Sequence, residues 1–213
     1  KPMMYQRSPE YREVHSRVCE KAQKFLGSDE AFLVTGSGTA GLEAGIASLV
    51  REGDSVFVPH SGKFGERVAD IARVFCPKVS AMGFEYGKGI SLERVKQGID
   101  EFSPTVVALV HNETSTGACN RAKEIVAYAK KRGAIAIVDG ISSVGGHEFS
   151  LKEWGADFIV TGSQKALGAP PGLALVGLGK EAVARIEGNS PTAYYLSLKR
   201  YLDAGKENPP YTP

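Results

Sequence analysis

The most informative segment of this chain is Val160-Thr161-Gly162-Ser163-Gln164-Lys165-Ala166-Leu167-Gly168-Ala169-Pro170-Pro171-Gly172. It continues an apolar run that begins at Asp157, and it leads directly into a second apolar run at residues 172–177. Parallel strands need a long crossover between them, usually a helix, and this connection is too short to hold one. We therefore expect one antiparallel strand here, with the two strands at 157–161 and 172–177.

Strand and helix patterns alternate along the rest of the chain. Runs such as 105–110 and 134–138 are apolar throughout, which is typical of parallel strands covered by helices on both faces. We therefore expect an α/β fold with a doubly wound, mainly parallel sheet, one antiparallel strand and helices on both faces. Ser8 and Gly27 fit the N-cap and the stop of the first helix. The other expected strands cover residues 31–34, 55–58 and 79–82, and the expected helices cover residues 9–26, 39–50, 62–75, 91–102, 121–132, 179–187 and 190–203.

The composition is that of a globular protein with one large core. The chain has 213 residues, of which 42% are hydrophobic and 23% are charged. A net charge of +2 without a basic cluster gives no reason to expect nucleic acid or a membrane surface as a partner. No apolar run approaches the roughly 20 residues of a membrane span, and no signal peptide pattern opens the chain. We expect a soluble, cytoplasmic protein.

The cysteines and the chain ends add two expectations. Cys19, Cys76 and Cys119 form no CxxC pair, which predicts reduced, mostly buried thiols and neither disulfides nor a zinc site. The sequence begins without methionine and stops at Pro213 in what resembles the middle of a connection. We therefore expect residues 1–213 to form one large domain that is a fragment of a longer polypeptide.

Two residues of this chain suit one particular chemistry. Lys165 lies between a buried strand and a rigid Pro170-Pro171-Gly172 turn, and Asp139 ends the apolar run 134–138. Pyridoxal 5'-phosphate needs an amine that anchors it as a Schiff base and a carboxylate that keeps its ring nitrogen protonated. Most lysines are surface residues and a carboxylate after a strand can simply cap a turn, but together the two residues favour this cofactor.

Two polar segments follow other predicted strands, at the edge where open α/β sheets bind ligands. Gly36-Ser37-Gly38-Thr39-Ala40-Gly41 opens a helix, whose free N–H groups and positive end suit a phosphate. The alternative explanation of these glycines is tight packing between strand and helix. The segment 111–117 contains Thr114, which is either a turn residue or a contact to a ligand oxygen.

Two apolar side chains could lie against a flat ring. Phe64 stands between Gly62 and Gly65 after a predicted strand, where it can pack on the turn or stack on a heterocycle. Ile141 follows Asp139 by two residues and would press on the ring's face as an apolar wall.

Together, these segments resemble the large domain of class V aminotransferases. These are fold-type-I pyridoxal phosphate enzymes that include alanine–glyoxylate and serine–pyruvate aminotransferases. The resemblance runs from about residue 5 to the end. It rests most on Ser163-Gln164-Lys165 with Ala169-Pro170-Pro171-Gly172, on Asp139 and on Ser37-Gly38-Thr39.

The resemblance implies a role for each of these residues. Lys165 would form the Schiff base, Asp139 would pair with the pyridine nitrogen, and Ile141 would pack against the ring. Phe64 matches the stacking position, where relatives often carry Trp. The phosphate-binding positions are matched by Ser37, Gly38, Thr39 and Gln164, and Thr114 matches the polar residue beside the phenolic oxygen.

The resemblance also implies a homodimer in which each subunit completes the other's active site. Thr212 matches a threonine that reaches the phosphate in the neighbouring subunit. Relatives often place a tyrosine three residues earlier, where this chain has Pro209. The family's smaller C-terminal domain, which carries the arginine that binds the substrate carboxylate, is not within residues 1–213.

We therefore expect amino-group transfer from alanine, serine or aspartate to a 2-oxo acid such as glyoxylate or pyruvate, with Lys165 as general base and acid. Cysteine desulfurase-like lyases are similar, but usually have histidine before the lysine, a stacking histidine and a cysteine in a later loop. This chain has Gln164 and Phe64, and no cysteine follows Cys119. An inactive fragment that binds the cofactor is the other alternative.

Overall fold

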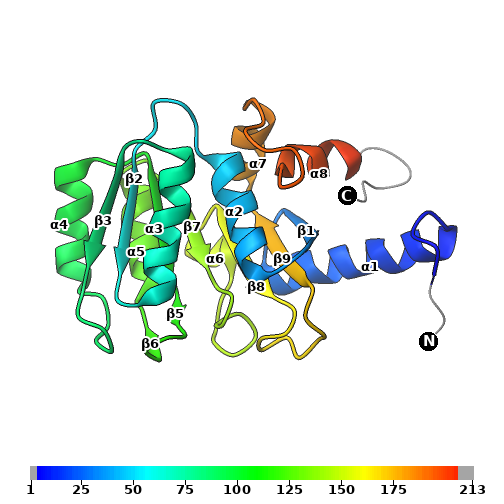
Figure 1. Ribbon diagram of the computed structural model, residues 1–213, viewed down its shortest axis with the longest axis horizontal. Coiled ribbons are helices and arrows are strands. Elements are labelled where there is room, and N and C mark those ends of the chain that lie inside the picture. Colours follow the sequence, from blue (N-terminus) through cyan, green and yellow to red (C-terminus); the bar gives the residue numbers. More distant parts are fainter. Residues whose placement is uncertain (1–3, 206–213) are drawn as a thin grey trace.

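A seven-stranded sheet forms the centre of the structure, with the strand order β1–β9–β8–β7–β4–β2–β3 (Figure 1). The computed structural model describes residues 4–205. The strands of this sheet are β1 (Glu30–Thr35), β2 (Val56–His60), β3 (Val79–Gly83), β4 (Val106–Val110), β7 (Ile135–Asp139), β8 (Phe158–Gly162) and β9 (Leu173–Leu178).

β9 runs against the direction of the other strands. It pairs antiparallel with β8, where Gly162 lies opposite Ala174, and with β1, where Val34 lies opposite the same residue. The remaining strand pairs of the sheet are parallel. The prediction of a mainly parallel sheet with one antiparallel strand is confirmed, because the turn after β8 reverses the chain without a helix.

Helices cover both faces of the sheet, as predicted. The hydrophobic cores on the two sides are formed by different sets of helices. One side carries α2 (Gly38–Leu49), α3 (Lys63–Phe75), α7 (Lys180–Glu187) and α8 (Leu198–Gly205), and the other carries α1 (Pro9–Leu26), α4 (Leu92–Phe102), α5 (Ala122–Lys131) and the short α6 (Leu151–Trp154). A small hairpin, β5 (Asn112–Glu113) with β6 (Ala118–Cys119), stands apart from the main sheet and was not predicted.

The predicted ends of α1 are confirmed in detail. The Ser8 side chain accepts a hydrogen bond of 3.2 Å from the N–H of Tyr11, which satisfies one free donor of the first turn. Gly27 ends the helix in the left-handed region, with φ of 64°. Local sequence therefore determines where this helix begins and ends.

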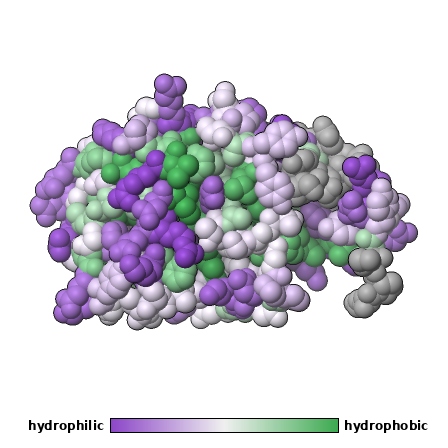
Figure 2. Space-filling model, viewed as in Figure 1, coloured by the Kyte–Doolittle hydropathy of each residue, from purple (hydrophilic) through white to green (hydrophobic). Residues whose placement is uncertain are grey.

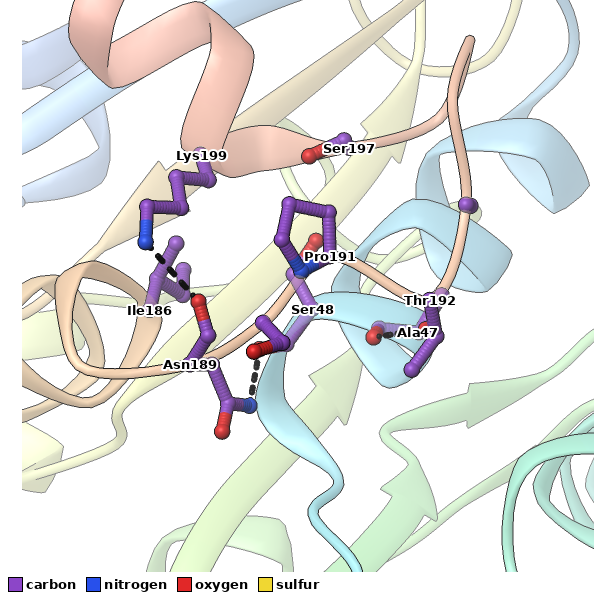
Figure 3. Close-up of a pocket in the computed structure, with 10 residues that line it drawn as sticks. Ala47, Ser48, Ile186, Asn189, Pro191, Thr192, Ser197 and Lys199 are labelled. Atoms are coloured by element: carbon purple, nitrogen blue, oxygen red, sulfur yellow. Dashed lines mark hydrogen bonds between the residues drawn. The ribbon is translucent and has the colours of Figure 1, made fainter.

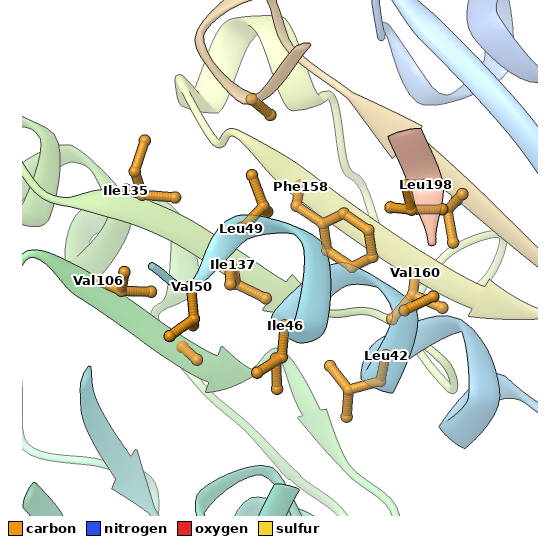
Figure 4. Close-up of a cluster of buried hydrophobic side chains, with 14 of the residues drawn as sticks. Leu42, Ile46, Leu49, Val50, Val106, Ile135, Ile137, Phe158, Val160 and Leu198 are labelled. Atoms are coloured by element: carbon orange, nitrogen blue, oxygen red, sulfur yellow. The ribbon is translucent and has the colours of Figure 1, made fainter. Parts of the chain in front are cut away.

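α2 packs most deeply of the helices around the sheet. Its side chains Leu42, Ile46 and Leu49 are fully buried against β4, β7 and β8 (Figure 4). Gly45 lets the helix approach β8, since a Cβ atom at this position would lie 2.3 Å from Cζ of Phe158. The small residues of α2 thus bring the start of this helix close to the ends of the central strands.

α3 is amphipathic. Its inner face buries Val68, Ala69 and Ala72. Its outer face carries the ion pairs Lys63–Glu66 (2.9 Å) and Asp70–Arg73 (2.7 Å), and a hydrophilic band crosses this part of the surface in Figure 2.

The helix predicted at 190–203 begins only at Leu198, so the prediction was wrong for residues 190–197. Asn189 and Thr192 donate side-chain hydrogen bonds of 3.1 and 2.7 Å to carbonyl groups in the last turn of α2 (Figure 3). Those carbonyls have no partner within their own helix. The segment before Leu198 therefore caps α2 instead of forming a helix.

The cysteine prediction is confirmed only in part. Cys19, Cys76 and Cys119 are free thiols, but only Cys76 is buried and Cys119 is exposed on the β5–β6 hairpin, which lies outside the main sheet. Within residues 4–205, no helix is both long enough and apolar enough to cross a bilayer.

The close approach of α2 to β8 predicts the effect of a substitution. Gly45→Val should lower the free energy of unfolding by roughly 1–3 kcal/mol, because the added methyl groups collide with Phe158. Urea denaturation measures this loss. Gly89→Ala is the control, because a Cβ atom there meets nothing within 4 Å. Equal stability of the two variants would contradict this account of the packing.

Candidate active site

The residues predicted to carry chemistry gather at one edge of the sheet. The β5–β6 hairpin and the loops after β7 and β8 lie along the lower edge in Figure 1, where α2 also begins. This is the edge formed by the carboxyl ends of the parallel strands, where ligands bind in open α/β sheets.

Asp139 is the buried charge at the centre of this edge. It is the last residue of β7, lies between β4 and β8, and is only 4% exposed. Burial raises the pKa of its carboxyl to about 6, and the charge of Glu113 adds to this. The N–H of Ile141, 2.9 Å away, and the cations Arg67 and Lys165 lower the pKa. Ionised Asp139 is therefore stabilised by any further positive charge placed beside it.

Lys165 lies in an ordered turn after β8. Its N–H donates to the carbonyl of Gly162 at 3.2 Å, and its carbonyl accepts from Gly168 at 3.0 Å. Ser163 anchors the rest of the loop by donating a 2.7 Å hydrogen bond to the carbonyl of Pro170. The side chain of Lys165 is half-buried, and its charge acts on the pKa of Asp139. The two predicted catalytic residues therefore belong to one site.

Ser37, Gly38 and Thr39 form the start of α2. Ser37 is the N-cap and its hydroxyl accepts from the N–H of Ala40 at 3.3 Å. The next N–H groups have no acceptor within the helix and can bind an anion. Tight packing is present as well, because a Cβ atom at Gly38 would lie 2.8 Å from Cδ1 of Ile141. The packing explanation of this glycine-rich turn is therefore confirmed, and its free N–H groups leave phosphate binding as a prediction.

Ile141 and Gln164 lie beside the start of α2 and the end of β8. A Cβ atom at Gly162 would lie 3.6 Å from Ile141 Cγ2 and 2.9 Å from Gln164 Oε1. Ile141 thus separates Gly38 from Gly162, and its half-buried side chain offers an apolar wall. Gln164 is exposed and offers a side-chain amide.

Thr114 is joined to the loop that follows Asp139. Its hydroxyl donates a 2.7 Å hydrogen bond to the hydroxyl of Ser142, which in turn donates to the carbonyl of Asn112 at 2.9 Å. Thr114 is therefore both a turn residue and a neighbour of the site.

Phe64 lies in the first turn of α3 and is half-buried. The guanidinium of Arg67 lies 4.8 Å from the centroid of its ring, a cation–π contact. The same guanidinium donates to the hydroxyl of Thr39 at 3.2 Å. Arg67 thus connects the predicted stacking residue with the predicted phosphate-binding turn.

The sequence analysis missed two residues of this site, Arg67 and Glu113. Arg67 follows Phe64 by three residues on a helix. This spacing places both side chains on the same face of the helix, so Arg67 could have been predicted from the position of Phe64. Glu113 precedes Thr114 and stands at a strand end, but the local sequence says nothing about the hydrogen bonds that it accepts from α3. Thr212 and Pro209 lie outside the described residues.

The buried position of Asp139 predicts how stability depends on pH. The folded protein keeps a proton on Asp139 up to about pH 6, whereas the unfolded chain releases it near pH 4, so stability from this group falls as the pH rises through that window. Asp139→Asn should therefore raise the free energy of unfolding of the cofactor-free protein by roughly 3 kcal/mol at pH 8 and by much less at pH 4. Urea denaturation at the two pH values tests this, and an equal gain at both would contradict it.

Comparison with known proteins agrees with this geometry. The family model described as aminotransferase class V matches residues 2–200. An aminotransferase of Methanocaldococcus jannaschii, itself uncharacterised, is 38% identical, with 100% of this chain and 56% of that protein covered. L-aspartate–glyoxylate aminotransferase of Paracoccus denitrificans is 32% identical, with the same coverage.

The chain is also similar to solved structures of aminotransferases. The crystal structure of pyridoxamine–pyruvate aminotransferase from Mesorhizobium loti matches with a TM-score of 0.93 and 32% identity, covering 100% of this chain and 56% of that one. The chain thus spans little more than half the length of these relatives. The strand order, the position of the lysine and carboxylate, and these matches lead to one conclusion: the chain belongs to the class V aminotransferase family.

Proposed function

We propose that this chain is the large, cofactor-binding domain of an aminotransferase that depends on pyridoxal 5'-phosphate. One observation carries the proposal: half-buried Lys165 and buried Asp139 belong to one site, at the sheet edge where α2 begins. Membership of the class V family supports it.

The residues present fit this cofactor. The start of α2 offers N–H groups and the hydroxyl of Thr39 to a phosphate, and the guanidinium of Arg67 lies beside that hydroxyl. Phe64 and Ile141 offer apolar faces to a flat ring. Buried Asp139 favours a protonated ring nitrogen, because a cation beside it lowers the pKa of its carboxyl.

Two of these residues have a chemical task in amino-group transfer. The bound cofactor would supply an electron sink for the negative charge that develops at the substrate Cα. Lys165 would hold the cofactor through its amine and, as general base and acid, would take the proton from the substrate Cα and deliver it to C4′ of the cofactor. Asp139 would keep the ring nitrogen protonated.

The proposed substrates are a small amino acid and a 2-oxo acid. One relative is named for aspartate and glyoxylate, and a solved neighbour for pyridoxamine and pyruvate. We therefore propose alanine, serine or aspartate as the donor and glyoxylate or pyruvate as the acceptor. We further propose a cytoplasmic homodimer in which Thr212 reaches the phosphate of the neighbouring subunit.

Removing the lysine tests the proposed chemistry. Lys165→Ala should lower kcat for transamination by about 10²–10⁴-fold, because the group that moves the proton at Cα is lost. Borohydride should bleach the yellow wild-type protein and fix the cofactor to Lys165, as mass spectrometry of its peptides would show. Lys152→Ala, on an exposed position of α6, is the matched control. An undiminished rate in Lys165→Ala would overturn the proposal.

A panel of donors and acceptors, run on the full-length polypeptide, tests the reaction class. Small amino acids should change the cofactor spectrum, and turnover should require a 2-oxo acid. Release of sulfide from cysteine without an acceptor would instead indicate a lyase. A yellow protein whose spectrum no amino acid changes would indicate binding without catalysis.

A further inference from the structure

Glu113 is a buried carboxylate that amino-group transfer leaves without a role. It lies in the β5–β6 hairpin, and it is only 1% exposed. A buried carboxylate is costly unless hydrogen-bond donors surround it. Its contacts therefore indicate what it does.

These contacts form a cap for α3. One carboxylate oxygen of Glu113 accepts from the N–H of Phe64 at 3.3 Å, and the other accepts from the N–H of Gly65 at 2.9 Å. Ser115, whose hydroxyl donates to Glu113 at 2.7 Å, accepts from the N–H of Lys63 at 3.0 Å. Three successive N–H groups at the start of α3 are thus satisfied by the hairpin.

The start of α3 lacks a cap of its own. Its N-cap position is Gly62, which has no side chain to accept a hydrogen bond. The glycine also makes room, because a Cβ atom there would lie 2.4 Å from Cγ of Glu113. Gly62 and Glu113 therefore work as a pair, in which one residue leaves space and the other supplies the cap.

The charge of Glu113 has a second effect. The positive end of α3 stabilises the Glu113 carboxylate. The negative charge of Glu113 in turn raises the pKa of nearby Asp139. Replacing Glu113 can therefore act on the site either through the position of Phe64 or through the ionisation of Asp139.

We propose that Glu113 is a positioning residue: it caps α3 from another part of the chain and thereby holds the Phe64 ring where it can cover the cofactor. The role of the ring rests on the proposed function, whereas the cap itself does not. The expected consequence is that the ring loses its fixed place when the carboxylate is removed or shortened.

The substitution Phe64→Trp provides a direct reporter. Trp154 is the single tryptophan of the sequence, so subtracting the wild-type signal from that of Phe64→Trp isolates the introduced indole. In the Phe64→Trp background, both Glu113→Gln and Glu113→Asp should increase acrylamide quenching of the introduced indole at least twofold. Glu113→Gln places an N–H donor where the N–H groups of α3 need an acceptor. Glu113→Asp keeps the carboxylate but moves it farther from these N–H groups, because its side chain is shorter. Quenching of Trp154, measured in the single variants, should stay unchanged.

Glu113→Asp distinguishes the effect of the carboxylate's position from the effect of its charge, because it shortens the side chain and keeps the charge. Affinity for pyridoxal phosphate, measured by absorbance titration of the full-length polypeptide, should fall about tenfold in both variants. Glu93→Gln, which removes an exposed carboxylate from the first turn of α4, is the control and should change neither measurement. If Glu113→Asp behaves as wild type and only Glu113→Gln differs, the effect is one of charge and the proposal is wrong.

Other outcomes are equally decisive. Quenching that rises for the introduced indole and for Trp154 together would indicate general loosening and would overturn the positioning role. If Glu113→Gln does not fold, Ser115→Ala, which removes the acceptor for Lys63 and the hydroxyl that donates to Glu113, should still raise quenching of the introduced indole, and no rise would overturn the cap. Because quenching is read without cofactor, a protein that binds no pyridoxal phosphate would refute the proposed function and leave this test intact.

Discussion

The burial of Asp139 at the end of β7 is the constraint on which the rest of the site depends. A carboxylate enclosed by neighbouring strands cannot be solvated, so its charge must be balanced by groups that the fold brings to it. The structure places Lys165 and Arg67 near enough to lower its pKa, and Glu113 near enough to raise it. The site thus favours a ligand that brings a positive charge, which a protonated pyridine does.

The same edge of the sheet depends on close packing of α2. Glycines at 38 and 45 allow the helix to lie against Ile141 and Phe158, and this places its free N–H groups at the strand ends. The close packing of α2 and the position of its free N–H groups are therefore two consequences of one arrangement. α3 follows a similar principle, since Gly62 makes room for the carboxylate that caps it.

Much of the fold could be predicted because its signals are local. Apolar runs mark the strands, Ser8 and Gly27 mark the ends of α1, and the short connection after β8 requires an antiparallel neighbour. The prediction was wrong where a distant contact decided the conformation. Residues 190–197 have a helical pattern, yet Asn189 and Thr192 cap α2 instead.

The fold class, the family resemblance and the candidate catalytic residues could be predicted without the structure, because Lys165 and Asp139 each stand in a recognisable local context. The positions of these residues relative to one another depend on long-range packing. Glu113 caps a turn that lies 48 residues away along the chain, and Arg67 reaches Thr39 across two helices. Contacts of this kind depend on how the helices and the hairpin pack together, and no local pattern of residues records that packing.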